Sequence, residues 1–311
     1  MGNKSKKIRS KWSRMSWNDK LFLLMVYAVI IAIVFICVYP VYFTIIASVS
    51  DPFDVYMGKV NLWPSGFTLE SYGLVFQNES IWRGYANSVY YTVVGTLFNM
   101  TLTIPCAYAL SKKKMYGRNF LMTVFLITMY FSGGLIPTYM LYRQMDLINT
   151  RGILILNGAV SVYNVIVTRT YFQNNISVTL FEAARIDGAS EFGIFFKLVL
   201  PLSAPIIAVI ALYYAVGHWS SYFPAMVYTS DNDIQPLQIV LRRILILNES
   251  AYEDALSSGD ATLIQNAVKQ SYLAASMKYA LVFIASAPML IIYPFVQKHF
   301  VKGVMVGAVK G

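Results

Sequence analysis

Residues 21–48 read LFLLMVYAVIIAIVFICVYPVYFTIIAS, an apolar run without a charged side chain. A hydrocarbon core about 30 Å thick is crossed by about 20 apolar residues in a helix, so this run is long enough to span a bilayer. It is also too long for the apolar core of a signal peptide, and therefore predicts a retained first span. The composition agrees, because 57% of the 311 residues are hydrophobic and only 13% are charged, against about 25% charged residues in soluble domains.

The same length criterion marks five further spans along the chain. Together they predict an all-α membrane protein with six transmembrane helices. The predicted spans are residues 21–48, 85–110, 120–142, 152–172, 198–228 and 279–296. They divide the chain into a basic N-terminal tail (1–20), a six-helix domain (21–300) and a C-terminal tail (301–311).

Lysine and arginine residues cluster in alternate loops between these spans. Loops rich in these residues are retained on the cytoplasmic side, so the pattern predicts that both termini are cytoplasmic. With the N-terminus inside, the inner segments hold 17 of the 25 basic residues: Lys4, Lys6, Lys7, Arg9, Lys11, Arg14, Lys20, Lys112, Lys113, Lys114, Arg118, Arg169, Arg185, Lys197, Lys298, Lys302 and Lys310. Their placement between apolar segments, rather than along one face, argues against a nucleic-acid partner.

Residues capable of metal binding or covalent catalysis are few. The two cysteines, Cys37 and Cys106, lie inside apolar runs, which favours two small buried hydrophobic side chains. The two histidines, His218 and His299, lack the neighbouring ligands of a zinc site. No serine or cysteine stands in an evident nucleophilic arrangement. We therefore expect no metal site and no catalysis in this chain.

The predicted inner loop of residues 173–197 contains most of the stretch TLFEAARIDGASEFGIFFKLVLPLSAP, which covers residues 179–205. Thr179 and Glu182 have the spacing of a capping box, which predicts the start of a short helix. Gly188 can adopt the left-handed conformation that ends a helix. A second helix is expected from about Ala189, so the sequence predicts a bent amphipathic element at the membrane surface.

This stretch resembles the EAA motif of ABC importer permeases, through Glu182-Ala183-Ala184, Asp187-Gly188-Ala189 and Leu200-Pro201. The resemblance implies a type I importer permease fold, in which residues 179–197 form a cytoplasmic coupling helix seated on an ATP-binding subunit. It assigns the coupling contact to Glu182, Ala183, Ala184, Asp187, Gly188, Ala189 and Pro201.

A wider resemblance covers nearly the whole chain. Residues 87–88 and 107–111 are similar to the second span of carbohydrate-uptake permeases of the maltose type, and residues 132–139, 217–225 and 300–311 to a subgroup for complex oligosaccharides. The resemblance implies a prokaryotic cytoplasmic membrane, a second homologous permease, a dimer of ATP-binding subunits carrying ATP and Mg²⁺, and an extracytoplasmic sugar-binding protein. The chain has no Gly-x-x-x-x-Gly-Lys-Ser/Thr loop, so we expect no cofactor here and ATP hydrolysis on another polypeptide.

Polar and aromatic side chains inside two spans are candidates for a sugar path, because sugars combine apolar faces with hydroxyl edges. The candidates are Asn157, Ser161, Asn164, His218, Trp219 and Tyr222. The alternative is that the aromatic residues form interfacial belts and the polar ones hydrogen-bond between helices. Two other functions also stay open: an importer for a non-sugar solute, because the loop motif is shared by amino-acid, peptide and ion importers, and an ion-driven transporter, although charges deep in the spans are lacking.

Overall fold

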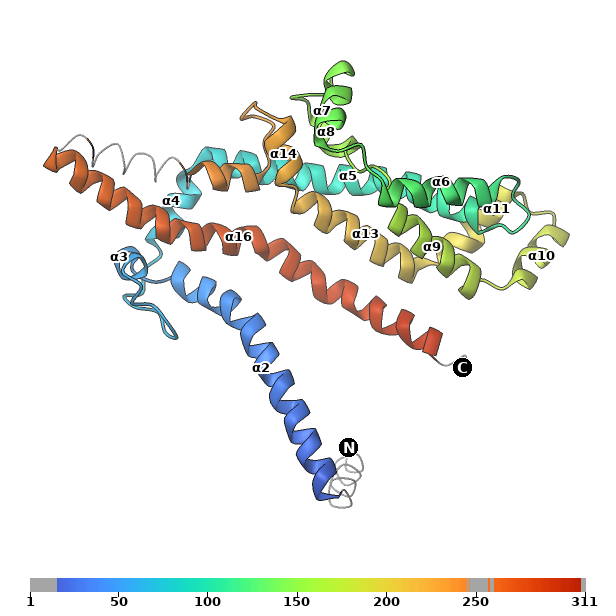
Figure 1. Cartoon of the computed structure of the whole chain (residues 1–311), viewed down its shortest axis with the longest axis horizontal. Coiled ribbons are helices and arrows are strands. Elements are labelled where there is room, and N and C mark those ends of the chain that lie inside the picture. The colour runs from blue at the N-terminus through green and yellow to red at the C-terminus, as the bar shows by residue number, and fades with distance from the viewer. Residues whose placement is uncertain (1–15, 245, 247–256, 258–259, 309–311) are drawn as a thin grey trace.

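The computed structural model describes residues 16–244, 246, 257 and 260–308, with only the backbone described at 263 and 295–308. Within these residues every regular element is a helix (Figure 1), which confirms the predicted all-α class. Residues 1–15 and 309–311, the ends of the two predicted tails, lie outside the described residues. Residues 301–308 continue the last helix.

The helices are arranged in chain order as follows. They are α2 (Trp17–Ser48), α3 (Pro52–Tyr56), α4 (Glu70–Gln77), α5 (Glu79–Ser111), α6 (Arg118–Tyr130), α7 (Leu135–Gln144), α8 (Arg151–Leu156), α9 (Val162–Asn175), α10 (Val178–Ile186), α11 (Glu191–Ile194), the π-helix η1 (Phe195–Val199), α12 (Leu200–Leu202), α13 (Ala204–Trp219), α14 (Phe223–Tyr228) and α16 (Ala261–Ala308).

Helix α2 stands largely apart from the other helices. It lies against α16 at its C-terminal end and diverges from the rest of the molecule toward its N-terminal end (Figure 1). Only Ile46, Ala47 and Ser48 are buried in it. Cys37 is exposed, so the expectation that this cysteine is buried is wrong. The physical reason is that no other described helix of the chain covers this part of α2.

The main core lies where α5 packs against α9 and α13. Helices α11 and η1 add their apolar side chains to it, so the segment after α10 is part of the bundle. The buried members are Ile104, Ala107, Leu110, Val165, Phe172, Ile176, Ile194, Phe195, Val199, Ile206, Ile210 and Tyr214. Burial of this many large apolar side chains fixes the relative positions of these helices.

Within the described residues, three helices are long and apolar enough to cross a membrane: α2, α5 and the 264–294 part of α16. Two bent pairs would raise the number to five if each is one span. The pair α6 and α7 bends by 112°, and residues 191–202 meet α13 at 81°. The predicted span 152–172 is divided between α8 and α9 by residues 157–161.

Candidate functional site

The N-cap of α10 lies two residues before the predicted capping box. Its N-cap is Ser177, whose side chain accepts a hydrogen bond from the Thr179 backbone N–H at 3.3 Å. The expectation that Thr179 and Glu182 form a capping box is therefore wrong. Ser177 takes the cap position because its backbone is extended, as an N-cap requires, whereas Thr179 is already inside the helix.

The end of α10 is a sharp turn centred on Gly188. The φ angle of Gly188 is +75°, which confirms the predicted left-handed conformation. The Ala189 N–H donates to Ala184 O at 2.9 Å, and the Gly188 N–H donates to Arg185 O at 3.0 Å. These two bonds make a Schellman motif, which satisfies carbonyls that the helix end would otherwise leave free.

One face of α10 packs on the bundle and the other is open. Phe181 and Ala184, three residues apart, pack against the main core. Glu182 and Ala183 are exposed, as are residues 187–189 of the turn. The bundle therefore holds the apolar face of α10 while the motif residues stay accessible to another protein.

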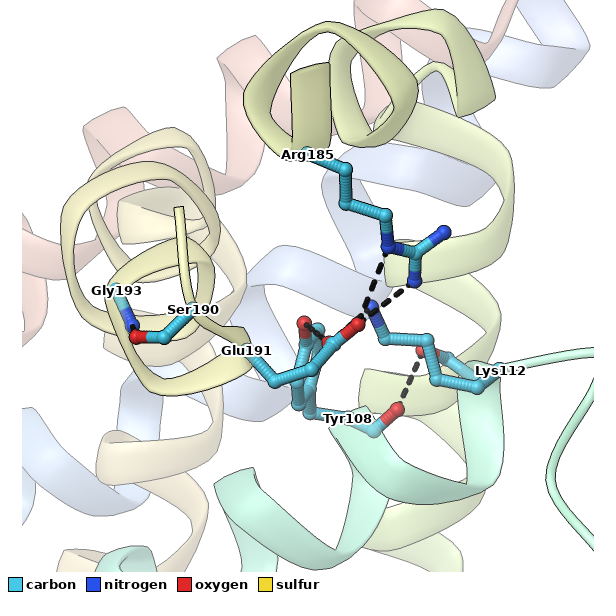
Figure 2. Close-up of polar contacts among 7 residues, drawn as sticks. Tyr108, Lys112, Arg185, Ser190, Glu191 and Gly193 are labelled. Carbon is cyan, nitrogen blue, oxygen red and sulfur yellow. Dashed lines mark hydrogen bonds and ion pairs between the residues drawn. The ribbon is translucent and has the colours of Figure 1, made fainter. Parts of the chain in front are cut away.

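The side chain of Glu191, at the first position of α11, connects α10 with the C-terminal end of α5. Its Oε1 accepts from Arg185 Nη2 at 2.7 Å and from Arg185 Nε at 3.3 Å. Its Oε2 accepts from Lys112 Nζ at 3.1 Å and from Tyr108 OH at 3.1 Å. Figure 2 shows these four side chains converging, and we call Tyr108, Lys112, Arg185 and Glu191 the Glu191 cluster.

Electrostatics keep the Glu191 carboxylate charged. Hydrogen bonding from Arg185, supported by Lys112 and Tyr108, lowers the pKa of Glu191 to about 2, because each donor favours the ionised form. The carboxylate therefore stays ionised at neutral and mildly acidic pH. Ser190 fixes the backbone beside it, since its Oγ accepts from the Gly193 N–H at 3.1 Å as the N-cap of α11 (Figure 2).

Aromatic rings surround the α5 side of the Glu191 cluster. The Lys112 Nζ lies 4.3 Å from the Tyr108 ring centroid and 4.2 Å from that of Phe181. Such contacts favour a cation over an aromatic face. The Tyr108 ring also lies 5.0 Å from the Phe195 ring. The cluster is therefore seated on the main core rather than hanging from the surface.

Helix α9 fixes the same end of α5 from another direction. Arg169 Nε donates to Leu110 O at 3.0 Å, and Gln173 Nε2 donates to Ser111 O at 3.1 Å. These carbonyls belong to the last turn of α5 and have no partner within the helix. The end of α5 is thereby hydrogen-bonded to α9 and to Glu191 of α11, and it contacts α10 through Lys112 over the Phe181 ring.

The connection from α11 to α13 contains a π-helical turn and a bend. Pro201 and Pro205 lack a backbone N–H, and each stands in the first turn of its helix, α12 or α13, where a proline is tolerated. Ser203 lies between them at the 81° bend. Pro201 is exposed on α12, and helices α11 and η1 separate it along the chain from Glu182 and the turn after α10.

A second polar region lies midway along α5, against α13 and the break between α8 and α9. Asn99 Nδ2 donates to Gly158 O at 3.2 Å, which leaves Asn99 Oδ1 to accept from His218 Nε2 at 3.2 Å. A Cβ at Gly95 would lie 2.5 Å from the His218 ring, so a glycine is required for this approach. We call Gly95, Asn99, Gly158 and His218 the His218 cluster.

The His218 cluster borders a cavity of about 210 Å³. Asn157 also lines this cavity, and its Oδ1 accepts from Tyr142 OH at 3.2 Å. A neighbouring open cavity of about 670 Å³ is lined by Ser161 and Asn164. Tyr213 and Tyr214 line both, so the two cavities adjoin along one side of α13.

Comparison with known proteins identifies the chain. Residues 80–306 match the family described as "Binding-protein-dependent transport system inner membrane component". The chain belongs to this family. The permease resemblance read from the Glu182 to Pro201 stretch is confirmed, and so is the expectation that the chain is a transport subunit and not an enzyme, because the family consists of permease subunits.

Individual relatives align with the permease over most of its length. It is 38% identical over 294 residues, 94% of the chain and 100% of the relative, to the polygalacturonan/rhamnogalacturonan transport system permease protein YtcP of Bacillus subtilis. It is 28% identical to the arabinooligosaccharides transport system permease protein AraQ of Halalkalibacterium halodurans, over 90% of the chain and 93% of the relative.

A solved structure shares the fold of the permease. A chain of a bacterial ABC transporter involved in the import of the acidic polysaccharide alginate superposes with a TM-score of 0.81. It is 30% identical and covers 92% of the permease and 99% of the matched chain. The described helices are therefore those of an ABC importer permease, an inner-membrane component with several apolar helices.

The structure brings some predicted path residues together and separates others. Asn157 and His218 share one cavity, and Ser161 and Asn164 line the next. Trp219 instead faces α16, where its Nε1 donates to Ala285 O at 2.9 Å. The Tyr222 ring lies 5.8 Å from the Arg242 guanidinium, on the side of α14.

Several residues of both regions of the permease were not predicted as site residues. In the cavity these are Asn99, Tyr213 and Tyr214; Tyr214 OH accepts from the Ser161 N–H at 3.0 Å and bonds Thr103 Oγ1 at 2.6 Å. Near α10 they are Tyr108, Lys112 and Glu191. One signal was present, since Glu191 directly follows the helix-starting Ser190 and is the one acidic residue in that first turn.

Proposed function

We propose that this permease forms half of the translocation path of an ATP-driven importer for a sugar or oligosaccharide. The observation that carries the proposal is the 38% identity with a polygalacturonan/rhamnogalacturonan permease over the whole length of that relative. The 30% identity to a chain of an alginate importer points to the same class of cargo. Both are long saccharides, so the proposed cargo is an oligosaccharide.

The proposed assembly contains a second homologous permease, a dimer of ATP-binding subunits that hold ATP and Mg²⁺, and an extracytoplasmic binding protein. The family description supports the binding protein. The exposed apolar surface of α2 supports a membrane setting with lipid or a second permease around it. Six spans with both termini in the cytoplasm remain our proposed topology, with α6 and α7 as one span and α8 and α9 as another.

Residues 179–197 are proposed to couple this permease to the ATP-binding subunit. Glu182, Ala183, Asp187, Gly188 and Ala189 are exposed on one side of α10 and its turn, which suits a contact with another subunit. Ala184 faces the core and is proposed to hold α10 in place. Pro201 would act through the bend before α13 rather than at the contact itself.

The substrate path is proposed to run beside the two cavities along α13. Asn157, Ser161 and Asn164 supply amide and hydroxyl groups there, and Tyr213 and Tyr214 supply rings on which a sugar could stack. Tyr213 is exposed, whereas Tyr214 and His218 are buried. Tyr213 is thus the stronger candidate for direct contact, and His218 and Trp219 for shaping the wall.

Reconstitution tests the proposal. The chain would be assembled in lipid nanodiscs and in proteoliposomes with its partner permease, ATP-binding subunits and binding protein, and ATP hydrolysis and uptake would be measured. We expect an oligosaccharide carried by the binding protein to stimulate both. Stimulation by an amino acid but by no saccharide would overturn the sugar assignment. Uptake by the purified chain alone, without ATP-binding subunits, would overturn the ATP-driven mechanism.

A further inference from the structure

The Glu191 carboxylate divides its two oxygens between two helices. Oε1 bonds only Arg185, which lies on α10, and Oε2 bonds only Lys112 and Tyr108, which belong to the end of α5. Within the described residues, Glu191 is the one carboxylate that forms an ion pair with either Arg185 or Lys112. A single side chain thus links the two elements through charge.

Glu191 itself is held by the core. It begins α11, whose Ile194 is buried, and Phe195 directly after it is buried as well. Between α10 and α11 lie only residues 187–190, which include the turn at Gly188. Phe181 and Ala184 pack α10 on the core, and the bond from Arg185 to the fixed Glu191 carboxylate adds a second, polar attachment on the side of the turn.

The position of the Glu191 cluster suits it to orient α10 more than to stabilise the fold. The Glu191 and Arg185 side chains are 55% and 49% exposed, and ion pairs with this exposure contribute little to folding. The Lys112 side chain is only 22% exposed and lies between two rings. Lys112 and Tyr108, on the α5 side of the cluster, are therefore held more firmly than Arg185, and Glu191 is the residue that connects Arg185 to them.

Helix α5 provides a route from this cluster to the cavities. It is one helix of 33 residues from Glu79 to Ser111, about 50 Å long at 1.5 Å per residue. The same helix carries Gly95 and Asn99, which contact His218 and Gly158. A displacement of α10 that is passed to the end of α5 therefore reaches the wall of the His218 cavity.

We propose that Glu191 is a positioning residue that fixes α10 to the C-terminal end of α5, so that motion of α10 is delivered to the cavity wall. This role rests on the proposed coupling function of α10. It adds a residue that is not one of the motif residues 182–184, 187–189, 200 and 201, and it assigns that residue a partner at the C-cap of α5, Lys112.

The test uses the full chain in the assembled transporter. Spin labels at Val178→Cys on α10 and Lys113→Cys beyond α5, both exposed positions, report the distance between the two elements after Cys37 and Cys106 are replaced by alanine. Glu191→Gln keeps the size of the side chain and removes its charge. Glu79→Gln is the matched control, because Glu79 is also an exposed glutamate at the first position of a helix.

We expect Glu191→Gln to broaden the label distance and to lower transport per ATP hydrolysed by roughly fivefold, with the melting temperature and the stimulated ATPase rate nearly unchanged. Glu79→Gln should change none of these. Lys112→Met should behave as Glu191→Gln does, and the double variant should be no worse than either single variant, because both remove one link.

An unchanged label distance or an unchanged transport per ATP in Glu191→Gln would overturn the role of Glu191. So would additive losses in the double variant, or a fall in melting temperature with a matching fall in ATPase rate, which would indicate a purely structural contribution. The label distance needs no substrate. If the wild-type assembly moves no saccharide, the proposed function fails while the link between α10 and α5 is still tested.

Discussion

The two polar clusters along α5 differ in charge and in burial. The Glu191 cluster, at the end of α5, is formed by a carboxylate, a guanidinium, an ammonium and a phenol, and its charged side chains are at least 22% exposed. The His218 cluster, midway along α5, joins an amide, an imidazole and a backbone carbonyl. Asn99 and His218 are both buried, at 1% and 9% exposure.

The difference follows from the cost of burial. An ion inside a bilayer protein costs several kcal/mol unless it is paired, whereas a neutral group needs only its hydrogen bonds. Midway along α5 the chain therefore uses neutral groups in close contact, and at the end of α5 it uses charges. The buried cluster determines how closely helices approach, and the exposed cluster determines how a surface helix is oriented.

Substitution at Gly95 is the strongest way to break the buried cluster. A Cβ there would lie 2.5 Å from two atoms of the His218 ring, and the buried ring has little room to move. Gly95→Ala should lower the free energy of unfolding by about 3 kcal/mol, measured by thermal or denaturant unfolding of the purified protein. Gly217→Ala is the control, since a Cβ at this glycine of α13 meets nothing within 4 Å. Equal stability of the two variants would contradict the packing argument.

Gly188 is restricted for a different reason, and its substitution tests the exposed region. No atom lies within 4 Å of its would-be Cβ, but its φ angle is +75°. Gly188→Val should cost about 1–2 kcal/mol through the left-handed backbone alone, and transport per ATP should fall as the turn changes. Gly188→Asn is the control, because asparagine tolerates this conformation better. If asparagine and valine were equally disruptive, side-chain space at the subunit contact would be the cause instead.

Removing the amide of Asn99 sharpens the comparison without adding bulk. Asn99→Ala leaves the His218 ring N–H and the Gly158 carbonyl without their partner. Hydrogen bonds between helices in bilayers contribute about 0.6–1.7 kcal/mol, and we expect an unfolding loss in that range. Asn174→Ala, at an exposed position of α9, should be neutral. A loss for Asn174 as large as for Asn99 would show that burial does not set the effect.

Local patterns in the sequence predicted more than the distant contacts did. The apolar run of α2 and the turn at Gly188 were predicted because each depends on residues within a few positions. The cap of α10 was assigned to Thr179 because Glu182 stands three residues after it, whereas Leu180 stands at that position after Ser177. The structure places the cap at Ser177.

Contacts between segments far apart in the chain could not be predicted from the sequence. Glu191 meets Lys112 across 79 positions, and His218 meets Asn99 across 119. Nothing in the local pattern of either member indicates the other. The split of the predicted span 152–172 was missed for a related reason. At the break the Gly158 carbonyl accepts from Asn99 and the Asn157 side chain accepts from Tyr142, and both partners lie on other helices.

The bend before α13 offers the smallest effect and the finest test of the same reasoning. Ser203 and Ser88 are both fully buried, yet Ser88 Oγ accepts from the Leu237 N–H at 2.9 Å, whereas Ser203 Oγ has no hydrogen-bond partner in the described part of the chain. Ser88→Ala should cost about 1 kcal/mol, and Ser203→Ala should cost about zero or stabilise the fold, because no bond is lost and an unpaired hydroxyl is removed. Unfolding of the isolated chain measures both. Ser203→Ala could also be neutral in the isolated chain and yet lower transport per ATP in the assembled transporter. That result would mean that the Ser203 hydroxyl gains a partner when the bend before α13 changes. Motion would then be transmitted at this bend as well as at the charged end of α5.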